Sequence, residues 1–136
     1  MKGFVTNIEE VTLENEYFRR VLYTAERSQL VVMCIPVGGD IGEEVHKDVD
    51  QFIRIEEGEG QSILDGVERE LTAGSVVVIP ALVRHNIKNT SPSKALKLYT
   101  LYSPPHHEDG IIHKTKADAL KDDEHFKGET TDDLTA

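Results

Sequence analysis

The chain has little with which to cross-link itself. Its 136 residues include one cysteine, Cys34, and no tryptophan. A single cysteine cannot form an internal disulfide, so the fold has to be held by its own core, which a chain of this length is able to bury. Because Cys34 stands in an apolar run, we expect a buried structural thiol, and a reducing cytoplasm as the compartment.

Long apolar segments and an excess of basic residues are also missing. No apolar run approaches the roughly 20 residues that a membrane-spanning helix needs. Acidic residues near the N-terminus interrupt the apolar stretch that a signal peptide requires. The formal net charge of -10 disfavours nucleic acid and anionic membrane surfaces as partners, because both present negative charge. We therefore expect the partner to be a small-molecule substrate.

Short apolar and β-branched runs separated by turn residues fill the chain from about residue 4 to residue 103. The expected strands lie near residues 17–24, 29–36, 51–57, 60–65, 67–72, 75–80, 84–89 and 95–102. The dipeptide Asp65-Gly66 is typical of a tight hairpin turn. No long helical period with caps appears in this region. Strands at such spacing predict an all-β sandwich or barrel.

Alternation along the strands predicts which side chains face the interior. Gln51 and Ile53 share one face of their strand, and Arg54 lies on the other. Tyr99 and Tyr102 lie on opposite faces of the last strand, so at most one of them lines an interior cavity. The run 75–80 shows no alternation, which predicts a strand buried on both faces, such as one at a dimer interface.

The residues after position 105 have a different character. We expect residues 1–105 to form the β-barrel and residues 106–136 to form a polar loop with histidines, a short helix and an acidic tail. The helix is expected over residues 115–125, with Thr115 as its N-cap. Residues 126–136 are acidic and poor in apolar side chains, so we expect them to fray.

Four polar side chains near strand ends are able to converge inside such a barrel. Glu44 and His46 are two residues apart, so on a strand both point to the same face. Gln51 opens the next strand, facing inward, and His85 follows another strand. A carboxylate, two imidazoles and an amide oxygen form a suitable ligand set for a divalent metal ion. The sequence therefore predicts a metal site at these four residues.

The same positions resemble the two motifs of the cupin family. The first motif is matched in spacing by Gly38, Glu44, His46, Gln51 and Gly58, and the second by Gly74, Pro80, His85 and Asn89. Fifteen residues separate the two motifs, and together they cover the central half of the chain. The resemblance implies a single double-stranded β-helix, or jelly-roll barrel. It also implies a homodimer, because most small cupins pair edge to edge.

Three positions depart from the cupin motifs. Glu44 replaces the first histidine, Gln51 replaces the glutamate, and Leu82 replaces the glycine that follows the proline. Since both substitutes ligate through oxygen, the resemblance implies four ligands for Zn, Fe(II) or Mn. The alternative is a barrel that has lost its metal and keeps these residues as hydrogen-bonded interior groups. An ionised Glu44 would then be costly to bury without a partner.

Side chains near the end of the barrel are candidates for acid–base chemistry. His106, His107 and His113 follow the last expected strand, where they could cover the barrel mouth and supply an acid, a base or a surface metal ligand. We take Tyr102 and His107 as the catalytic candidates; the alternatives are a core tyrosine and solvent-exposed histidines. Arg84, beside His85, is a candidate for binding a substrate carboxylate or phosphate.

Three functions remain open at this point. Phosphomannose isomerases, a cupin-related family, hold zinc with two His, one Glu and one Gln, and this chain offers the same ligand types with Glu and Gln exchanged. The resemblance therefore favours a metal-dependent isomerase acting on a small polyhydroxy or carbohydrate-like metabolite. The second hypothesis is an Fe(II)-dependent dioxygenase, although the three-His-one-Glu set is absent. The third is a non-catalytic small-molecule or metal-binding cupin.

Overall fold

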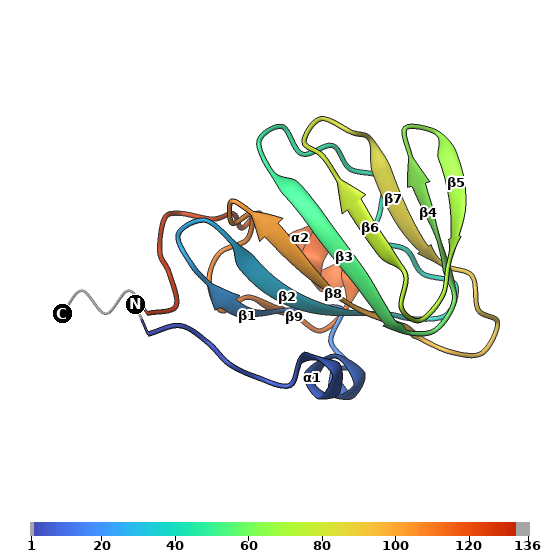
Figure 1. The fold of residues 1–136 in the computed structure, drawn as a ribbon, viewed down its shortest axis with the longest axis horizontal. Helices are drawn as coiled ribbons and strands as arrows, with labels where there is room; N and C mark the ends of the chain where they lie inside the picture. The colour runs from blue at the N-terminus through green and yellow to red at the C-terminus, as the bar shows by residue number, and fades with distance from the viewer. Residues whose placement is uncertain (1, 133–136) are drawn as a thin grey trace.

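The computed structural model describes residues 2–132, and antiparallel strands are its main regular secondary structure (Figure 1). The elements are α1 (Ile8–Glu14), β1 (Arg19–Thr24), β2 (Gln29–Ile35), β3 (Asp50–Glu57), β4 (Gly60–Leu64), β5 (Val67–Leu71), β6 (Val76–Ile79), β7 (His85–Asn89), β8 (Leu96–Ser103), β9 (Ile112–His113) and α2 (Lys116–Lys121). A six-stranded sheet has the order β6-β3-β8-β2-β1-β9, and a three-stranded sheet has the order β5-β4-β7. The predicted all-β jelly roll with a short C-terminal helix is confirmed.

The core lies on the inner face of the six-stranded sheet and extends to the three-stranded sheet. Ile53 and Ile55 of β3, Leu98 of β8 and Ile87 of β7 are fully buried within it. Burying each such side chain, rather than leaving it exposed to water, contributes about 1.5–3 kcal/mol to the free energy of unfolding. Strand β8 pairs with β2 on one side and β3 on the other, so it ties the large sheet together. The barrel therefore has an apolar core of its own.

The structure bears out the predicted facing of β3 and β8 but not that of β6. Gln51 points inward and Arg54 outward, and Tyr102 is buried whereas Tyr99 lies on the outer face. The prediction that the 75–80 strand is buried on both faces is wrong for the single chain, because β6 alternates and its Val76 and Val78 are exposed. Strand β6 is an edge of the large sheet, and the exposure of Val76 and Val78 shows that no other layer covers its outer face in the single chain.

The segment after residue 105 packs against the barrel. Strand β9 pairs with β1, and the Thr115 side chain caps α2 by accepting a hydrogen bond from the Asp118 amide, as predicted. The helix ends at Lys121 rather than at residue 125. The expected fraying is wrong over residues 126–132, where the Phe126 amide donates to the His106 carbonyl. Residues 133–136 of the expected tail lie outside the described residues.

The N-terminal segment contains a short helix that the sequence analysis did not expect. Helix α1 is capped by the Asn7 side chain, which accepts a hydrogen bond from the Glu10 amide. It packs beside β2, β3 and β8, below the large sheet in Figure 1. On β2, Cys34 is half-buried rather than fully buried, and that burial raises the pKa of its thiol.

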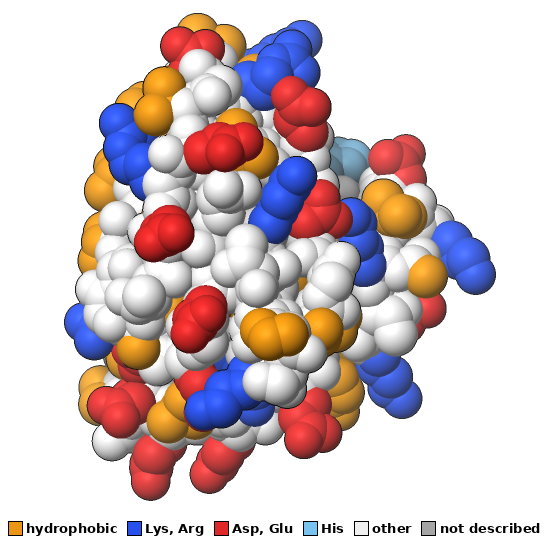
Figure 2. Space-filling view, turned by 90° about the vertical axis from the view of Figure 1, so that its right-hand side faces the viewer, with side chains coloured by type: hydrophobic (Ala, Val, Ile, Leu, Met, Phe, Trp, Pro, Cys, Tyr) orange, Lys and Arg blue, Asp and Glu red, His pale blue; other side chains and the backbone are white. Residues whose placement is uncertain are grey.

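The face that bears the three-stranded sheet is polar. Figure 2 shows acidic and basic side chains interspersed over it, with acidic ones along its lower edge. Within residues 2–132, no helix combines the length and the apolar character that a membrane crossing requires.

Candidate metal centre

Backbone pairing brings two of the predicted ligands together. Glu44 and His85 form an isolated antiparallel bridge, in which each amide donates to the other residue's carbonyl at 2.9 Å. Residues directly opposite in an antiparallel pair present their side chains on the same face. The His46 ring also lies on this side, with its centroid 5.1 Å from that of His85. The extended segment before β3 and the first residue of β7 thus bring three predicted ligands near one point.

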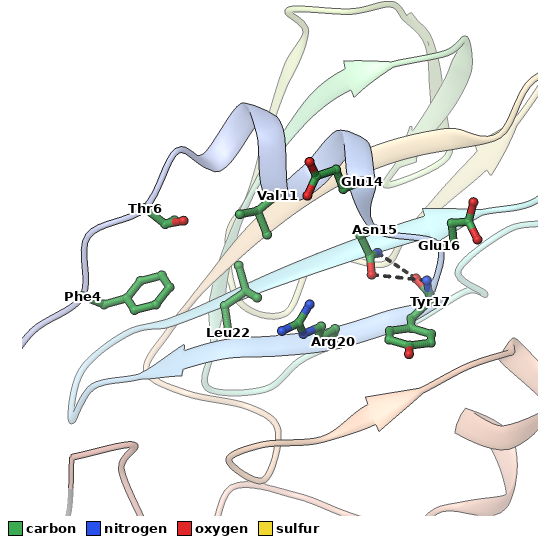
Figure 3. A pocket seen from close by; sticks show the side chains of 9 residues that line it. All are labelled: Phe4, Thr6, Val11, Glu14, Asn15, Glu16, Tyr17, Arg20 and Leu22. Atoms are coloured by element: carbon green, nitrogen blue, oxygen red, sulfur yellow. Dashed lines mark hydrogen bonds between the residues drawn. The ribbon is translucent and has the colours of Figure 1, made fainter.

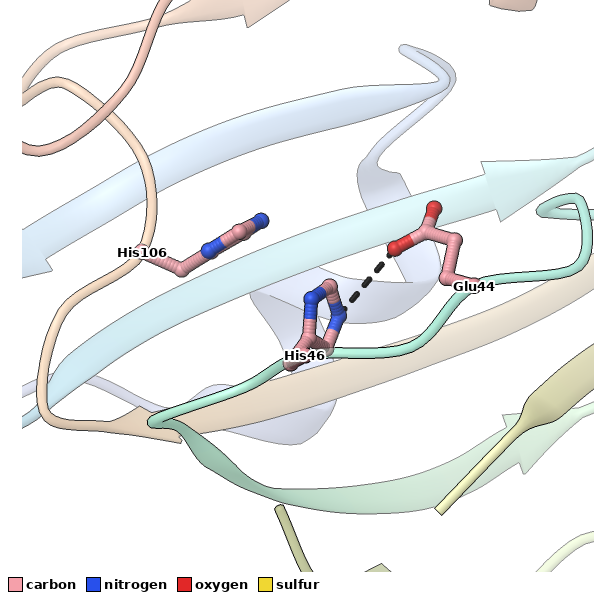
Figure 4. Close-up of side chains that lie close together, drawn as sticks. All are labelled: Glu44, His46 and His106. Carbon is pink, nitrogen blue, oxygen red and sulfur yellow. Dashed lines mark ion pairs between the residues drawn. The ribbon is translucent and has the colours of Figure 1, made fainter. Parts of the chain in front are cut away.

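A histidine from a distant segment completes a cluster of ligand atoms. Glu44, His46 and His106 each offer one atom, and these three atoms lie within 4.8 Å of one another. His106 comes from the loop after β8 and approaches the other two side chains from the opposite side (Figure 4). From the sequence, His106 was expected at the barrel mouth as an acid, a base or a surface metal ligand, and not as a member of the predicted four-residue site; its position directly after the last strand was the signal available.

Two buried ligand atoms show that the residues fit a metal ion. Among residues 2–132, His46 Nε2 and Gln51 Oε1 are buried without a hydrogen-bond partner. His46 Nε2 lies 3.1 Å from Glu44 Oε2 but is not aligned with it as a hydrogen bond. Gln51 donates through its amide nitrogen to Thr100 Oγ1 at 3.1 Å, which leaves its oxygen free. Buried polar atoms are seldom left unsatisfied, and both atoms are of types that ligate divalent metals.

The His85 ring is oriented by the backbone. Its Nδ1 lies 2.9 Å from the Val83 carbonyl oxygen, which can only accept, so Nδ1 bears the proton and Nε2 bears the lone pair. Metal-binding histidines commonly have one nitrogen held by a carbonyl in this way. His85 lies next to the three-atom cluster rather than within it. The ligand set of Glu44, His46, Gln51 and His85 stays a prediction.

Electrostatics at the cluster match what a metal ion requires. Burial raises the pKa of Glu44, but the neighbouring His46, Arg19 and His85 outweigh it and hold the pKa below its usual range. Burial lowers the pKa of His106 to about 4. At neutral pH the cluster therefore presents a carboxylate and a neutral His106 imidazole, the protonation states in which these groups ligate metals.

The two catalytic candidates belong to one hydrogen-bonded chain. His107 Nδ1 donates to Glu124 Oε1 at 2.7 Å, so His107 Nε2 bears the lone pair and faces the Tyr102 hydroxyl at 3.4 Å. Burial raises the pKa of Tyr102 and lowers that of His107. Gln29, fully buried on β2, holds the His107 backbone through its side-chain amide, whose nitrogen donates to the His107 carbonyl and whose oxygen accepts from the His107 amide. Glu124 was not anticipated, since it lies at the end of the helix expected over residues 115–125 and carries no motif.

The cluster opens onto a cavity of about 170 Å³. The Glu44 and His106 side chains form part of its wall, and Arg19 and His107 lie beside them. Helix α2 and the residues that follow it close the other side. Arg84, the sequence-based candidate for binding an anion, instead lies on the surface and pairs with Glu43 at 3.3 Å.

A larger hollow of about 480 Å³ lies elsewhere, between α1 and the outer face of β1. Figure 3 shows Phe4, Val11 and Leu22 on its floor, with Arg20 and Tyr17 at one end. Its charged side chains are exposed to solvent. Because nothing in this hollow resembles the ligand atoms described above, we assign the chemistry to the smaller cavity.

Comparison with known proteins agrees with this fold. The cupin domain family matches residues 31–102, a stretch that runs from β2 to β8 and includes all four predicted ligands. The chain belongs to the cupin family, as a small single-domain member with a possible metal site.

Its relatives include two curated proteins and one solved structure. The uncharacterized protein YrkC of Bacillus subtilis (strain 168) is 42% identical over 125 residues, which cover 88% of this chain and 67% of that protein. An uncharacterized protein of Acanthamoeba polyphaga mimivirus is 45% identical over 113 residues, covering 80% of this chain and 70% of that one. The crystal structure of BH2720 from Bacillus halodurans has a TM-score of 0.87 and 41% identity, covering 89% of this chain and 96% of that one.

Proposed function

We propose that this cupin binds Zn, Fe(II) or Mn and catalyses an isomerase-type proton transfer on a small polyhydroxy or carbohydrate-like metabolite. The observation that supports it is the cluster of Glu44, His46 and His106 ligand atoms, together with two buried atoms that lack a hydrogen-bond partner, His46 Nε2 and Gln51 Oε1. Glu44 and His85 are the other expected ligands, and His106 is a further one. A metal bound there supplies a Lewis acid for a substrate hydroxyl or carbonyl.

The Tyr102–His107–Glu124 chain supplies the proton transfer. Glu124 fixes the His107 tautomer, so that His107 Nε2 can take the proton of the Tyr102 hydroxyl or return it. The Tyr102 ring lies 5.3 Å from the His106 ring and 6.1 Å from the His46 ring, measured between centroids. A substrate oxygen held at the cluster is therefore within reach of an acid–base pair.

One observation favours the dioxygenase alternative. The three clustered side chains are two histidines and one carboxylate, which is the ligand composition of many non-haem Fe(II) oxygenases. Such an enzyme would not require Tyr102 to exchange a proton. A third possibility is a cupin that binds a small molecule or metal without catalysis.

Removing the Tyr102 hydroxyl tests the proposal. Tyr102→Phe keeps the ring but breaks the chain to His107, and Tyr99→Phe is the matched control on the outer face of the same strand. We would incubate the metal-loaded proteins with a panel of sugars and uronates in deuterated water and follow deuterium incorporation by NMR. Tyr102→Phe should lower the exchange rate by about 10²–10⁴-fold at unchanged metal content, and Tyr99→Phe should match the wild type.

Two outcomes would go against the isomerase. Equal exchange rates in Tyr102→Phe and the wild type would remove the proposed acid–base role. Oxygen consumption by the Fe(II)-loaded protein with any substrate of the panel, without deuterium incorporation, would favour the dioxygenase.

A further inference from the structure

Arg19 is a buried cation that forms no direct ion pair among the described residues. It opens β1 with only 7% of its surface exposed, and its side chain lines the 170 Å³ cavity. Among the described residues, its Nε has no hydrogen-bond partner, and its guanidinium belongs to no ion pair. Lysine and arginine side chains are almost never buried unless they are paired. We therefore expect the Arg19 guanidinium to bind a hydrogen-bond acceptor that residues 2–132 do not provide.

The guanidinium is held in place by neutral neighbours. His113 Nε2 donates to Asp122 Oδ2 at 3.0 Å, so His113 Nδ1 has a lone pair and accepts from Arg19 Nη1 at 3.3 Å. The guanidinium carbon lies 5.2 Å from the centroid of the Phe18 ring. These contacts orient Arg19 without neutralising its charge.

The carboxylates near Arg19 contact other residues. Glu44 lies against His46, and Glu124 accepts from His107. Asp40 pairs with Lys116. Among the described residues the Arg19 Nε–H therefore stays free for a ligand, and a carboxylate can accept two parallel hydrogen bonds from a guanidinium. Because Glu44 and Glu124 also line the cavity, a ligand with one negative charge is repelled less than a phosphate dianion is.

We propose that Arg19 binds the carboxylate of a small hydroxy acid, whose hydroxyl end lies toward Glu44 and His106. The inference rests on the proposed function for the hydroxyl end and narrows the substrate class to carboxylated polyhydroxy compounds. The cavity is smaller than the 300–1,000 Å³ usual for drug-sized ligands, so the ligand is small.

Binding of matched probes tests the role of Arg19. D-glycerate and glycerol differ by a carboxylate in place of a hydroxymethyl group, and inorganic phosphate tests the alternative anion. We would titrate each into wild-type protein and follow the Arg19 Nε–H resonance by NMR, with affinities from calorimetry. Arg19→Gln removes the charge and Arg19→Lys retains it. Arg20→Gln is the control, because Arg20 is the next residue on β1 and points outward.

D-glycerate should shift the Arg19 resonance, whereas glycerol should not. Arg19→Gln should weaken D-glycerate binding at least about tenfold, the loss expected for a charge-assisted pair. Arg19→Lys should lose less, and Arg20→Gln should match the wild type. An unshifted Arg19 resonance, equal binding by Arg19→Gln, or tighter binding of phosphate than of D-glycerate would overturn the proposal. If Arg19→Gln does not fold, the shift of the Arg19 Nε–H resonance in the wild-type protein alone tests the proposal.

The metal and carboxylate sites are tested separately. The D-glycerate titration is repeated on protein depleted of metal with a chelator, where the Arg19 resonance should still shift because the guanidinium is not a metal ligand. Arg19→Gln should bind as much metal as the wild type. A failure of the metal proposal would thus leave the Arg19 shift intact, and a failure at Arg19 would leave metal binding intact.

Discussion

The Leu82 amide donates a hydrogen bond of 2.6 Å to the His46 carbonyl. Leu82 occupies the position where the second cupin motif has glycine, and its φ of 74° lies in the left-handed region. The backbone conformation of the motif is therefore kept although the side chain is not glycine. Since Leu82 is 69% exposed, its side chain gains little from burial.

Leu82→Gly should stabilise the protein by about 1 kcal/mol. A left-handed conformation costs an L-residue about 1–2 kcal/mol and costs glycine almost nothing, while the greater freedom of glycine in the unfolded chain offsets part of the gain. Leu82→Ala keeps the Cβ atom and should show no such gain. Urea denaturation measures both free energies of unfolding. A Leu82→Gly variant no more stable than Leu82→Ala would show that this residue is not strained.

Asp40 should make the free energy of unfolding depend on pH at acidic pH. Its carboxylate accepts hydrogen bonds from Lys116 and from Asn86, and these lower its pKa. A carboxyl whose pKa is lower in the folded state than in the unfolded state stabilises the fold at pH values above the usual carboxyl pKa. This stability is lost as the pH falls through the lowered pKa. Because the Asp40 and Lys116 side chains are each about a third exposed, the effect should be at most about 1 kcal/mol.

Two variants separate Asp40 from the other carboxylates. Asp40→Asn should flatten the acid limb of the stability curve measured by thermal unfolding from pH 7 downward. Asp48→Asn, in the exposed turn before β3, should leave the curve unchanged. Identical acid limbs for Asp40→Asn and the wild type would mean that the bond to Lys116 adds no net stability.

The outer face of β6 is the place where we expect the homodimer to form. Val76 and Val78 are 48% and 60% exposed there, and Phe52 lies directly opposite Val78 on β3. Val78→Glu should convert dimers to monomers, because a carboxylate would be buried in an apolar interface. The control is Val67→Glu on β5, which is also half exposed but belongs to the small sheet. Sedimentation equilibrium measures the oligomeric state of each protein. A wild type that is monomeric at micromolar concentrations would rule out this interface.

The sequence predicts the barrel and the strand-end residues because both depend on short-range patterns. Period-two alternation places Gln51 and Tyr102 inside, and motif spacing places Glu44 next to His85. The exposure of Val76 and Val78 was missed because a run of valines does not show whether another layer covers the outer face of the strand. Helix α1 has only seven residues, too few for a helical period to be recognised.

Residues contributed by tertiary packing are harder to predict. Glu124 stands in an acidic stretch at the end of the helix expected over residues 115–125, yet it contacts His107 once the segment folds back on the barrel. Arg19 and Arg20 are adjacent and chemically identical, and only the register of β1 with β2 and β9 turns one inward. Neither position carries a motif that could have revealed it.

Metal content measures the central claim most directly. Purified, reconstituted wild-type protein analysed by inductively coupled plasma mass spectrometry should contain close to one Zn, Fe or Mn per chain. His46→Ala with His85→Ala should be empty, and His106→Ala should weaken binding by at least about tenfold, as disturbing a metal's surroundings commonly does. His125→Ala, an exposed histidine, should bind like the wild type. A full complement of metal in the His46→Ala, His85→Ala protein would contradict the account.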